Sequence, residues 1–433
     1  MGSTPAVIVV GGGLAGLVAT RHLAGAGLDV TLFERDEVVG GRVRTRSRDG
    51  FRFDRGFQVL FPAYPAVRRE LDLEALDLRR FAPGACIARP NHRSTLADPL
   101  REPRTFPATL FNPDISFGDK LRVVRLALEL GRTDPEAIFE GSGPDASIEA
   151  YLRERGFSDG FVENFVAPFY GGITLDRSLS TSKRIFEYTF RTLAASEAAV
   201  PAAGMGAIPA RLADEVRTAG GAIETGIGVT AVSSDEAAAG SGRATVTTDE
   251  GEEIDAAAVV VATDPPTARD LTNVDSIPTE ARACVTQYYE LPPGTDLETG
   301  GRLLLNASDE GPNQVVPHSA VAPEYAPDDA TLISATYLGE REESDEELAA
   351  ITRETLASWY PERRFDRLET LRTDRIGFAQ FEQPPGIYDR LLDARDPDGS
   401  VYLAGDYTQW SSIQGAMKSG RLAAKAVLED CSG

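Results

Sequence analysis

The chain has 433 residues, 42% of them hydrophobic, which is enough for two domains or one composite domain with a sizeable core. Its 67 acidic residues outnumber its 44 basic ones, and the formal net charge of −23 excludes attraction to nucleic acid and gives no overall electrostatic pull toward anionic lipid. The three cysteines and three histidines have neither disulfide nor metal-ligand spacing, so no metal site is expected.

The start of the sequence carries no recognisable targeting signal. The residues before Ala6 contain no basic segment followed by a long apolar segment, so no signal peptide is expected. No apolar run reaches the ~18 residues that span a bilayer. We therefore expect a soluble cytoplasmic protein that contacts a membrane at most peripherally. The acid excess with only four lysines favours a high-salt cytoplasm, where ~1 M salt shortens the Debye length to about 3 Å; an acidic protein from a GC-rich genome is the alternative.

The first predicted elements form a strand, a glycine turn, a helix and a second strand. Ala6–Val10 is a short apolar run typical of a buried parallel strand, Leu14–Ala26 has helical periodicity, and Leu28–Phe33 is a second strand. The turn has the spacing G-x-G-x-x-G, and an acid, Glu34, follows about 20 residues later. This order predicts a bound adenine dinucleotide, either NAD or FAD, rather than an ordinary glycine-rich turn.

Each position in this unit has a physical role. Gly11 allows the tight turn, Gly13 lets the backbone approach a pyrophosphate, and Gly16 lets the helix lie close to the strand. The free N–H groups at the helix start favour phosphate. Glu34 can accept hydrogen bonds from ribose hydroxyls and disfavours a 2′-phosphate, so NADP is not expected. The predicted contacts with the dinucleotide are Gly11, Gly13, Leu14, Ala15, Gly16, Glu34 and Arg35.

A second glycine-rich segment follows the second strand. Gly40 and Gly41 permit a sharp turn, after which Arg42 can place a planar cation against the pyrophosphate, although a solvated loop arginine is the alternative. The sequence FDRGFQ comes next, where Gly56 suggests close approach of the backbone to a flat group.

The motifs GGGLAG, FER, GGR and FDRGFQ together resemble the N-terminal part of the flavin-containing amine oxidase superfamily, which includes phytoene desaturases and protoporphyrinogen oxidases. The resemblance implies that Gly41 and Arg42 meet the pyrophosphate of FAD. It also implies that Gly56, Phe57 and Gln58 border the isoalloxazine ring.

Residues 62–200 lose the alternation of strands and helices, and the segments Phe117–Leu130, Ile148–Arg155 and Phe161–Phe169 are predicted helices of a cap over the flavin. Residues 200–209 resemble the P-x-G-G-M stretch of the superfamily, with Ala203 where a glycine is usual, and lead into a predicted helix over Ile208–Ala219.

The second half of the chain is predicted to return to strands. Two short strand pieces lie in Ala222–Val232, where the resemblance implies that Val229 contacts adenine through its backbone. A hairpin is expected over Ala244–Ile254 and a central parallel strand over Ala256–Ala262. Further strands, and a helix over Leu348–Trp359 preceded by the capping box Ser344 and Glu347, are expected to form a second sheet. Those strands are Arg302–Asn306, Asn313–Val316, Thr331–Leu338 and Leu371–Phe378.

The C-terminal part ends with another strand and helix. A strand over Val401–Leu403 runs into Gly405 and Asp406, and a helix is predicted over Ile413–Leu428. Asp406 can accept a hydrogen bond from a ribityl hydroxyl, and the N–H groups of Gln414, Gly415 and Ala416 can stabilise negative charge on the flavin. An ordinary Asp cap is the alternative for Asp406. The sequences LAGDYT and GAMKSGRLAA resemble plant-type carotenoid desaturases, which implies FAD rather than NAD.

The predicted fold class is α/β. A discontinuous Rossmann-like FAD-binding domain of the GR2 type (1–80, 200–265 and 396–433) is expected with an interleaved α+β substrate domain (81–199 and 266–395). Tyr170, Tyr407 and Trp410 are candidates for the substrate lining, although each fits core or flavin packing at least as well. No side chain is singled out as catalytic, because a flavin itself carries the redox chemistry.

The function implied by the resemblance is that of an FAD-dependent oxidoreductase. It takes a hydride from a C–H bond of a hydrophobic substrate, of the isoprenoid or polyene class, onto flavin N5. The alternatives are an amine oxidase, a protoporphyrinogen oxidase, and a flavin-binding module without turnover. Many amine oxidases carry a lysine near N5, and the absence of lysine between Leu271 and Arg395 disfavours that alternative.

Overall fold

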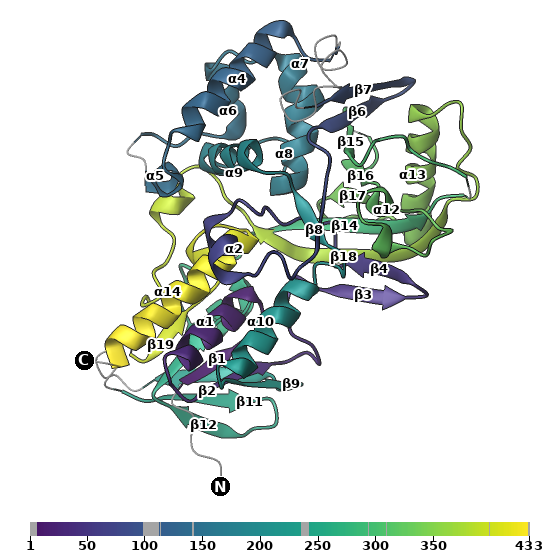
Figure 1. The fold of residues 1–433 in the computed structure, drawn as a ribbon. Helices are drawn as coiled ribbons and strands as arrows, with labels where there is room; N and C mark the ends of the chain where they lie inside the picture. Colours follow the sequence, from purple (N-terminus) through teal and green to yellow (C-terminus); the bar gives the residue numbers. More distant parts are fainter. Residues whose placement is uncertain are drawn as a thin grey trace.

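The computed structural model describes residues 7–97, 112, 114–140, 143–234, 242–292, 294–308, 310–397 and 399–431. It contains a five-stranded sheet and a seven-stranded sheet, with a group of helices beside the larger sheet (Figure 1). Ala6, the first residue of the first predicted strand, and the segment in which a signal peptide was sought lie outside these residues. The fold is α/β, as the sequence predicts.

The five-stranded sheet is entirely parallel and has the order β19-β13-β1-β2-β9. Its strands are β1 (Val7–Val10), β2 (Val30–Glu34), β9 (Ala222–Thr225), β13 (Ala258–Val261) and β19 (Val401–Leu403). The continuous apolar runs at Val7–Val10 and Ala258–Val261 lie side by side in the middle of the sheet, because a strand covered on both faces must be apolar on both. Both central strands are therefore confirmed.

Two different layers cover the faces of this sheet (Figure 1). Val7 and Val9 pack with the helices α1 (Leu14–Gly25), α10 (Ala207–Thr218) and α14 (Ile413–Cys431). Ile8 and Val10 point the other way and share a core with a three-stranded antiparallel sheet, because successive side chains of a strand alternate between faces. The strands of that small sheet are β10 (Val229–Ser234), β11 (Ala244–Thr248) and β12 (Glu253–Ala256).

The first and last helices of the chain are in direct backbone contact. A Cβ added to Gly420 of α14 would lie 2.2 Å from the carbonyl oxygen of Ala15 in α1, so only glycine lets the two helices approach this closely. A buried carboxylate strengthens the contact, since Glu70 of α2 (Pro65–Glu70) pairs with Arg21 of α1 and with Arg421 of α14. The two ends of the chain are thereby held together beside the first sheet.

The seven-stranded sheet has the order β18-β14-β17-β16-β15-β6-β7 and is antiparallel except where β15 pairs with β6. The four predicted strands of this region are present, and β14, β6 and β7 are additional. Helix α13 (Asp345–Trp359) covers one face and begins with the predicted capping box. The strands are β6 (Ala85–Arg89), β7 (His92–Leu96), β14 (Ala281–Glu290), β15 (Leu303–Asn306), β16 (Gln314–Val316), β17 (Leu332–Leu338) and β18 (Glu369–Phe381).

A helical cap stands beside this sheet at the top of Figure 1. The predicted helix over Phe161–Phe169 is wrong in detail, because the segment winds as a π-helix over Val162–Val166 before α8 begins at Ala167. Helix α9 was not predicted, although its apolar residues have helical spacing. The α-helices of the cap are α4 (Phe117–Gly131), α5 (Pro135–Glu140), α6 (Ile148–Glu154), α7 (Asp159–Phe161), α8 (Ala167–Thr174) and α9 (Lys183–Ala195).

Short strand pairs connect the two sheets. A hairpin of β3 (Thr45–Arg48) and β4 (Phe51–Asp54), and the pair β5 (Leu78–Arg80) with β8 (Ala199–Pro201), lie at these crossings.

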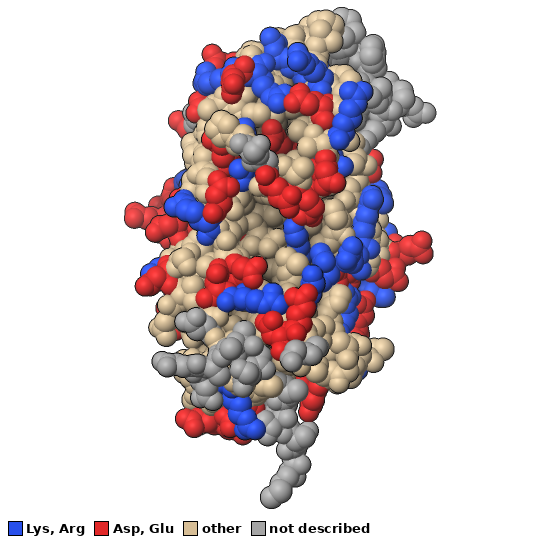
Figure 2. Space-filling view, turned by 90° about the vertical axis from the view of Figure 1, so that its left-hand side faces the viewer, with Lys and Arg blue, Asp and Glu red and all other residues tan. Residues whose placement is uncertain are grey.

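Charged side chains of both signs are spread over the face shown in Figure 2. In the part of the chain described, every helix is too short or too polar to cross a lipid bilayer.

Candidate functional site

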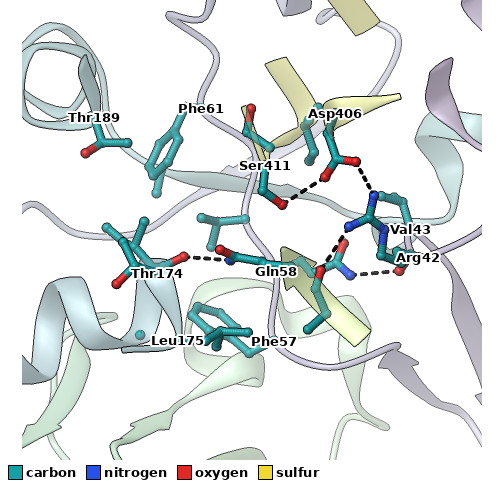
Figure 3. Close-up of a pocket in the computed structure, with 18 of the residues that line it drawn as sticks. Arg42, Val43, Phe57, Gln58, Phe61, Thr174, Leu175, Thr189, Asp406 and Ser411 are labelled. Carbon is teal, nitrogen blue, oxygen red and sulfur yellow. Dashed lines mark hydrogen bonds and ion pairs between the residues drawn. The ribbon is translucent and has the colours of Figure 1, made fainter. Parts of the chain in front are cut away.

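A cavity of about 1140 Å³ begins at the carboxyl ends of the first sheet and extends to the helical cap. One side of the cavity is lined by residues at or just after the ends of β1, β2 and β13, namely Val10, Phe33 and Ala262. The other side is lined by the helices α4, α8 and α9. Open parallel sheets bind ligands at this edge, because the loops after neighbouring strands diverge there. Figure 3 shows the part of the cavity around Arg42, Gln58 and Asp406.

Most of the residues predicted to hold the dinucleotide line this cavity. They are Gly11, Gly13, Leu14, Ala15, Glu34, Arg35, Gly41, Arg42, Phe57, Gln58, Val229, Gly405, Asp406 and Ala416. The remaining predicted residues, Gly16, Gly56, Gln414 and Gly415, lie just behind the lining and pack against other parts of the chain.

The glycine turn between β1 and α1 is closed by backbone contacts. Gly11 has a φ of +106° and donates its N–H to the carbonyl oxygen of Phe33 at 2.8 Å. A Cβ on Gly16 would lie 2.0 Å from the carbonyl oxygen of Gly11, whereas a Cβ on Gly13 would meet no atom within 4 Å. The turn is therefore tightly packed on its inner side and open on the side that faces the cavity.

Glu34 has a second role that the sequence did not predict. Its side chain is buried, with a relative exposure of 6% for the residue. One carboxylate oxygen accepts the N–H of Gly12 at 2.7 Å, and the other accepts the N–H of Asp36 at 2.9 Å. The acid thus ties the glycine turn to the end of β2, and it lines the cavity at the same place.

An ion pair joins the N-terminal and C-terminal motifs across 364 residues of sequence. Arg42 donates to Asp406 at 2.7 Å and to the carbonyl oxygen of Ala379 at 3.0 Å, and Ser411 donates to the second oxygen of Asp406 at 2.8 Å (Figure 3). Burial alone would lower the pKa of Arg42, but the attraction of Asp406 outweighs it and raises this pKa, so the guanidinium stays charged. A fixed cation beside an open glycine turn suits a diphosphate group.

Backbone N–H groups at the start of helix α14 already have hydrogen-bond acceptors within the chain. Ser412 accepts the N–H of Gly415 through its hydroxyl at 2.8 Å and the N–H of Ala416 through its carbonyl at 2.9 Å. The side chain of Gln414 accepts the N–H of Ala66 at 2.7 Å. The amides of Gly415 and Ala416, predicted to face the cofactor, therefore have acceptors within the chain.

Two of the three aromatic candidates line the cavity, and one does not. Tyr170 and Trp410 are among the lining residues. Tyr407 is completely buried and packs in the core against Gly405. A Cβ added to Gly405 would lie 2.1 Å from the ring of Tyr407. The prediction that Tyr407 lines the cavity is corrected in this respect, because its ring fills the space behind the Gly-Asp turn.

The far arm of the cavity is apolar. The rings of Phe165 and Phe169 are stacked with centroids 5.4 Å apart, and the hydroxyl group of Thr189 donates a hydrogen bond to a carbonyl oxygen of its own helix. Helix α9 supplies much of the lining of this arm, and its residues were not predicted as part of the site although their apolar spacing is helical. Its principal apolar residues are Phe81, Phe161, Phe165, Phe169, Phe190, Leu193, Leu303 and Leu305.

A buried acid supports the loop that carries Phe57 and Gln58. Asp54 accepts hydrogen bonds from Thr45 at 2.5 Å, from the N–H of Met205 at 2.9 Å and from Tyr325 at 2.8 Å. Burial raises the pKa of Asp54 to about 6, although these hydrogen bonds oppose the shift. Asp54 thereby joins four segments of the chain directly behind the cavity wall.

The free energy of unfolding should depend on pH through the titration of Asp54. Because the folded pKa lies above the unfolded value, the native state holds this proton more tightly, and stability falls by about 2 kcal/mol as the pH rises from 4 to 7. Asp54→Asn does not titrate, so its stability relative to the wild type should improve by that amount between pH 4 and pH 7. Urea unfolding of both proteins at the two pH values measures the difference; equal changes would place the pKa of Asp54 near its ordinary value.

Comparison with known proteins agrees with this geometry. Residues 14–428 match the family described as flavin containing amine oxidoreductase. The carotenoid 3,4-desaturase of Haloarcula japonica is 56% identical over 81 residues, covering 16% of this chain and 16% of that protein. The coproporphyrinogen III oxidase of Propionibacterium freudenreichii is 31% identical over 174 residues, covering 39% of this chain and 31% of that protein. Each match thus spans less than a third of the relative's length.

The similarity to solved structures extends over the whole chain. A double mutant of putrescine oxidase covers 98% of this chain and 99% of its own, with a TM-score of 0.71 and 19% sequence identity. At this identity the likeness establishes a common fold.

Proposed function

We propose that this chain, which belongs to the flavin-containing amine oxidoreductase family, oxidises a C–H bond of a hydrophobic substrate of the isoprenoid or polyene class. The chain is an FAD-dependent oxidoreductase. The observation that carries the substrate proposal is the continuous cavity, which has the pair of Arg42 and Asp406 at one end and stacked phenylalanine rings in its far arm.

The nucleotide end of the cavity fits FAD. Gly13 leaves open space where a diphosphate can approach the helix start, Arg42 provides a cation, and Glu34 and Asp406 provide acceptors for hydroxyl groups. Bound there, FAD supplies a flavin ring that can accept a hydride. We assign Val229 to the adenine end, and we assign residues 1–80, 200–265 and 396–433 to the FAD-binding domain, with the rest of the chain forming the substrate domain.

The chain's own contribution is to orient an apolar substrate and exclude water. The rings of Phe165 and Phe169 and the side chain of Leu193 present hydrocarbon surface, which holds a polyene by burial without fixing a charge. The hydroxyl groups of Thr174 and Thr189 donate hydrogen bonds to backbone carbonyl oxygens, at 2.9 and 2.6 Å, which lowers the polarity of the cavity wall. A substrate of this class dissolves in lipid, so we also propose that the protein makes peripheral contact with a membrane. We further propose a high-salt cytoplasm, because high salt screens the repulsion within a chain of net charge −23.

A second candidate is the oxidation of a porphyrinogen. It is favoured by the match to the coproporphyrinogen III oxidase, which covers 39% of this chain, against 16% for the carotenoid desaturase. Amine oxidation remains as the third candidate, and the absence of lysine between Leu271 and Arg395 disfavours it.

Anaerobic reduction of the flavin separates these candidates. The protein is purified in high salt and mixed, without oxygen, with a detergent-dissolved carotenoid precursor, with coproporphyrinogen, or with putrescine. We expect the carotenoid precursor alone to bleach the flavin absorbance. Phe165→Asp should slow this bleaching by at least about tenfold, because it places a charge in the apolar arm, while Val38→Asp on the surface should not. Bleaching by the porphyrinogen or the amine alone would contradict the proposal.

A further inference from the structure

Helix α4 carries an exposed apolar stripe. Phe117, Leu121, Val124 and Leu128 are 63%, 56%, 54% and 58% exposed, and in the described part of the chain Val38 is the only other large apolar residue with comparable exposure. Their spacing of four, three and four residues places them on one face of the helix. The opposite face of α4 is buried through Leu126 and Leu130, so both faces of this helix are apolar.

The stripe is continuous with the apolar arm of the cavity. Phe117, Val124 and Leu128 belong to the stripe and also line the cavity, together with Val123 and Ala127 on the adjoining side of α4. An apolar molecule that moves along α4 would therefore pass from the exposed stripe to the arm over mainly apolar side chains, with Lys120 as the charged residue of α4 in this lining. The stripe marks the mouth of the site.

Basic side chains border the stripe, although the protein as a whole is acidic. Arg122 and Arg125 lie on the exposed side of α4, and Arg132 follows its last turn. Figure 2 shows blue side chains, with red ones among them, near the top of the molecule, where Figure 1 places the helical cap. Apolar residues flanked by arginines match the two layers of a lipid surface, namely acyl chains and phosphate headgroups.

We infer that α4 docks on a lipid bilayer, with the stripe of Phe117, Leu121, Val124 and Leu128 inserted among the acyl chains. The bilayer then meets the mouth of the cavity and supplies the apolar substrate, so this inference rests on the proposed function for its biological purpose. A second copy of the chain is a poorer occupant. A 15-residue helix is about 22 Å long, and a contact confined to one of its faces falls well short of the ~800 Å² per partner typical of a stable interface.

Flotation with vesicles tests the docking surface. The holoenzyme is mixed with vesicles of equal parts phosphatidylcholine and phosphatidylglycerol and centrifuged through a density gradient. We expect the wild type to float, and the double variant Leu121→Glu with Arg125→Glu, at two exposed residues that do not line the cavity, to partition about a hundredfold less. The leucine loses its burial in lipid, and the arginine loses its attraction to phosphate headgroups. The matched control Val38→Glu, at a residue 58% exposed, should float like the wild type.

Every other outcome contradicts the inference. A wild type that stays at the bottom of the gradient lacks the docking surface, and a double variant that floats like the wild type docks through another surface. If sedimentation shows that the wild type is a dimer and the double variant a monomer, the stripe is an interface between copies. Because these residues are exposed, the double variant should keep its fold and its FAD.

The docking surface and the proposed function can fail independently. Flavin bleaching by a detergent-dissolved carotenoid precursor does not need a bilayer, so it should proceed in the double variant at a rate within about twofold of the wild type. Loss of flotation with bleaching intact supports the docking surface. Flotation of the wild type without bleaching would overturn the proposed function and leave the lipid contact standing.

Discussion

Replacing Gly16 with alanine is expected to abolish FAD binding and to lower the free energy of unfolding by about 3 kcal/mol. A Cβ at this position would lie 2.0 Å from the carbonyl oxygen of Gly11, which is backbone and cannot rotate away. Either α1 or the glycine turn must shift, and both carry the proposed diphosphate site. Flavin content after purification and the midpoint of denaturant unfolding measure the two effects.

Gly13→Ala is the matched control for this variant. A Cβ on Gly13 meets no atom of the chain within 4 Å, and its φ of −73° and ψ of −179° suit alanine. The unfolding free energy of the FAD-free protein should therefore stay equal or rise by up to ~1 kcal/mol, while FAD affinity falls because the methyl group occupies the proposed diphosphate space. Full FAD affinity in Gly13→Ala would show that the dinucleotide does not approach this turn.

Replacing Glu34 with alanine is expected to weaken FAD binding by about a hundredfold. The carboxylate is assigned to the ribose hydroxyls, and hydrogen bonds to a charged group contribute about 1.5–3 kcal/mol each. The same change leaves the buried N–H of Gly12 without its acceptor at 2.7 Å, which should lower stability by about 1–3 kcal/mol. Titration of the FAD-free protein with FAD gives the affinity, and thermal unfolding without FAD gives the stability.

Glu34→Gln separates the two roles of this side chain. Its amide oxygen can still accept the N–H of Gly12, but its amide nitrogen cannot accept the N–H of Asp36, so the unfolding free energy should fall by less than in Glu34→Ala. FAD affinity should fall to an intermediate value, because the negative charge is lost. Wild-type FAD affinity in Glu34→Ala, together with reduced stability, would restrict Glu34 to supporting the glycine turn.

The parts of the fold that follow from local sequence were predicted well. The run Val7–Val10, the helix after it and the strand that follows need only short-range patterns, and the apolar run Ala258–Val261 pairs with Val7–Val10 as a buried parallel strand should. The capping box of Ser344 and Glu347 fixed the start of α13 for the same reason.

The parts that depend on distant contacts could not be predicted in the same way. Strand β6 (Ala85–Arg89) pairs in parallel with Leu303–Asn306, more than two hundred residues away, and no local pattern reports such a partner. Strand β14 (Ala281–Glu290) carries threonine, glutamine and tyrosine side chains whose hydrogen bonds are made within the folded protein, so its sequence lacks the apolar run of a buried strand.

The candidate site shows the same division. The glycine spacing and the Gly-Asp turn identified Gly13 and Asp406 from local motifs, and both line the cavity. The bond from Glu34 to Gly12, and the ion pair between Arg42 and Asp406, depend on how loops close in three dimensions. Thr189 and its neighbours on α9 differ from these residues, because the helical spacing of the apolar residues in α9 is a local pattern from which the helix could have been predicted.

A crystal structure of the protein with its bound FAD tests the account most directly. One FAD should lie in the cavity, with its diphosphate between Gly13 and Arg42 and its ribityl chain beside Asp406. Its flavin ring should face the apolar arm that contains Phe165 and Phe169. FAD bound elsewhere, or a flavin that contacts only one of the two terminal motifs, would contradict the account.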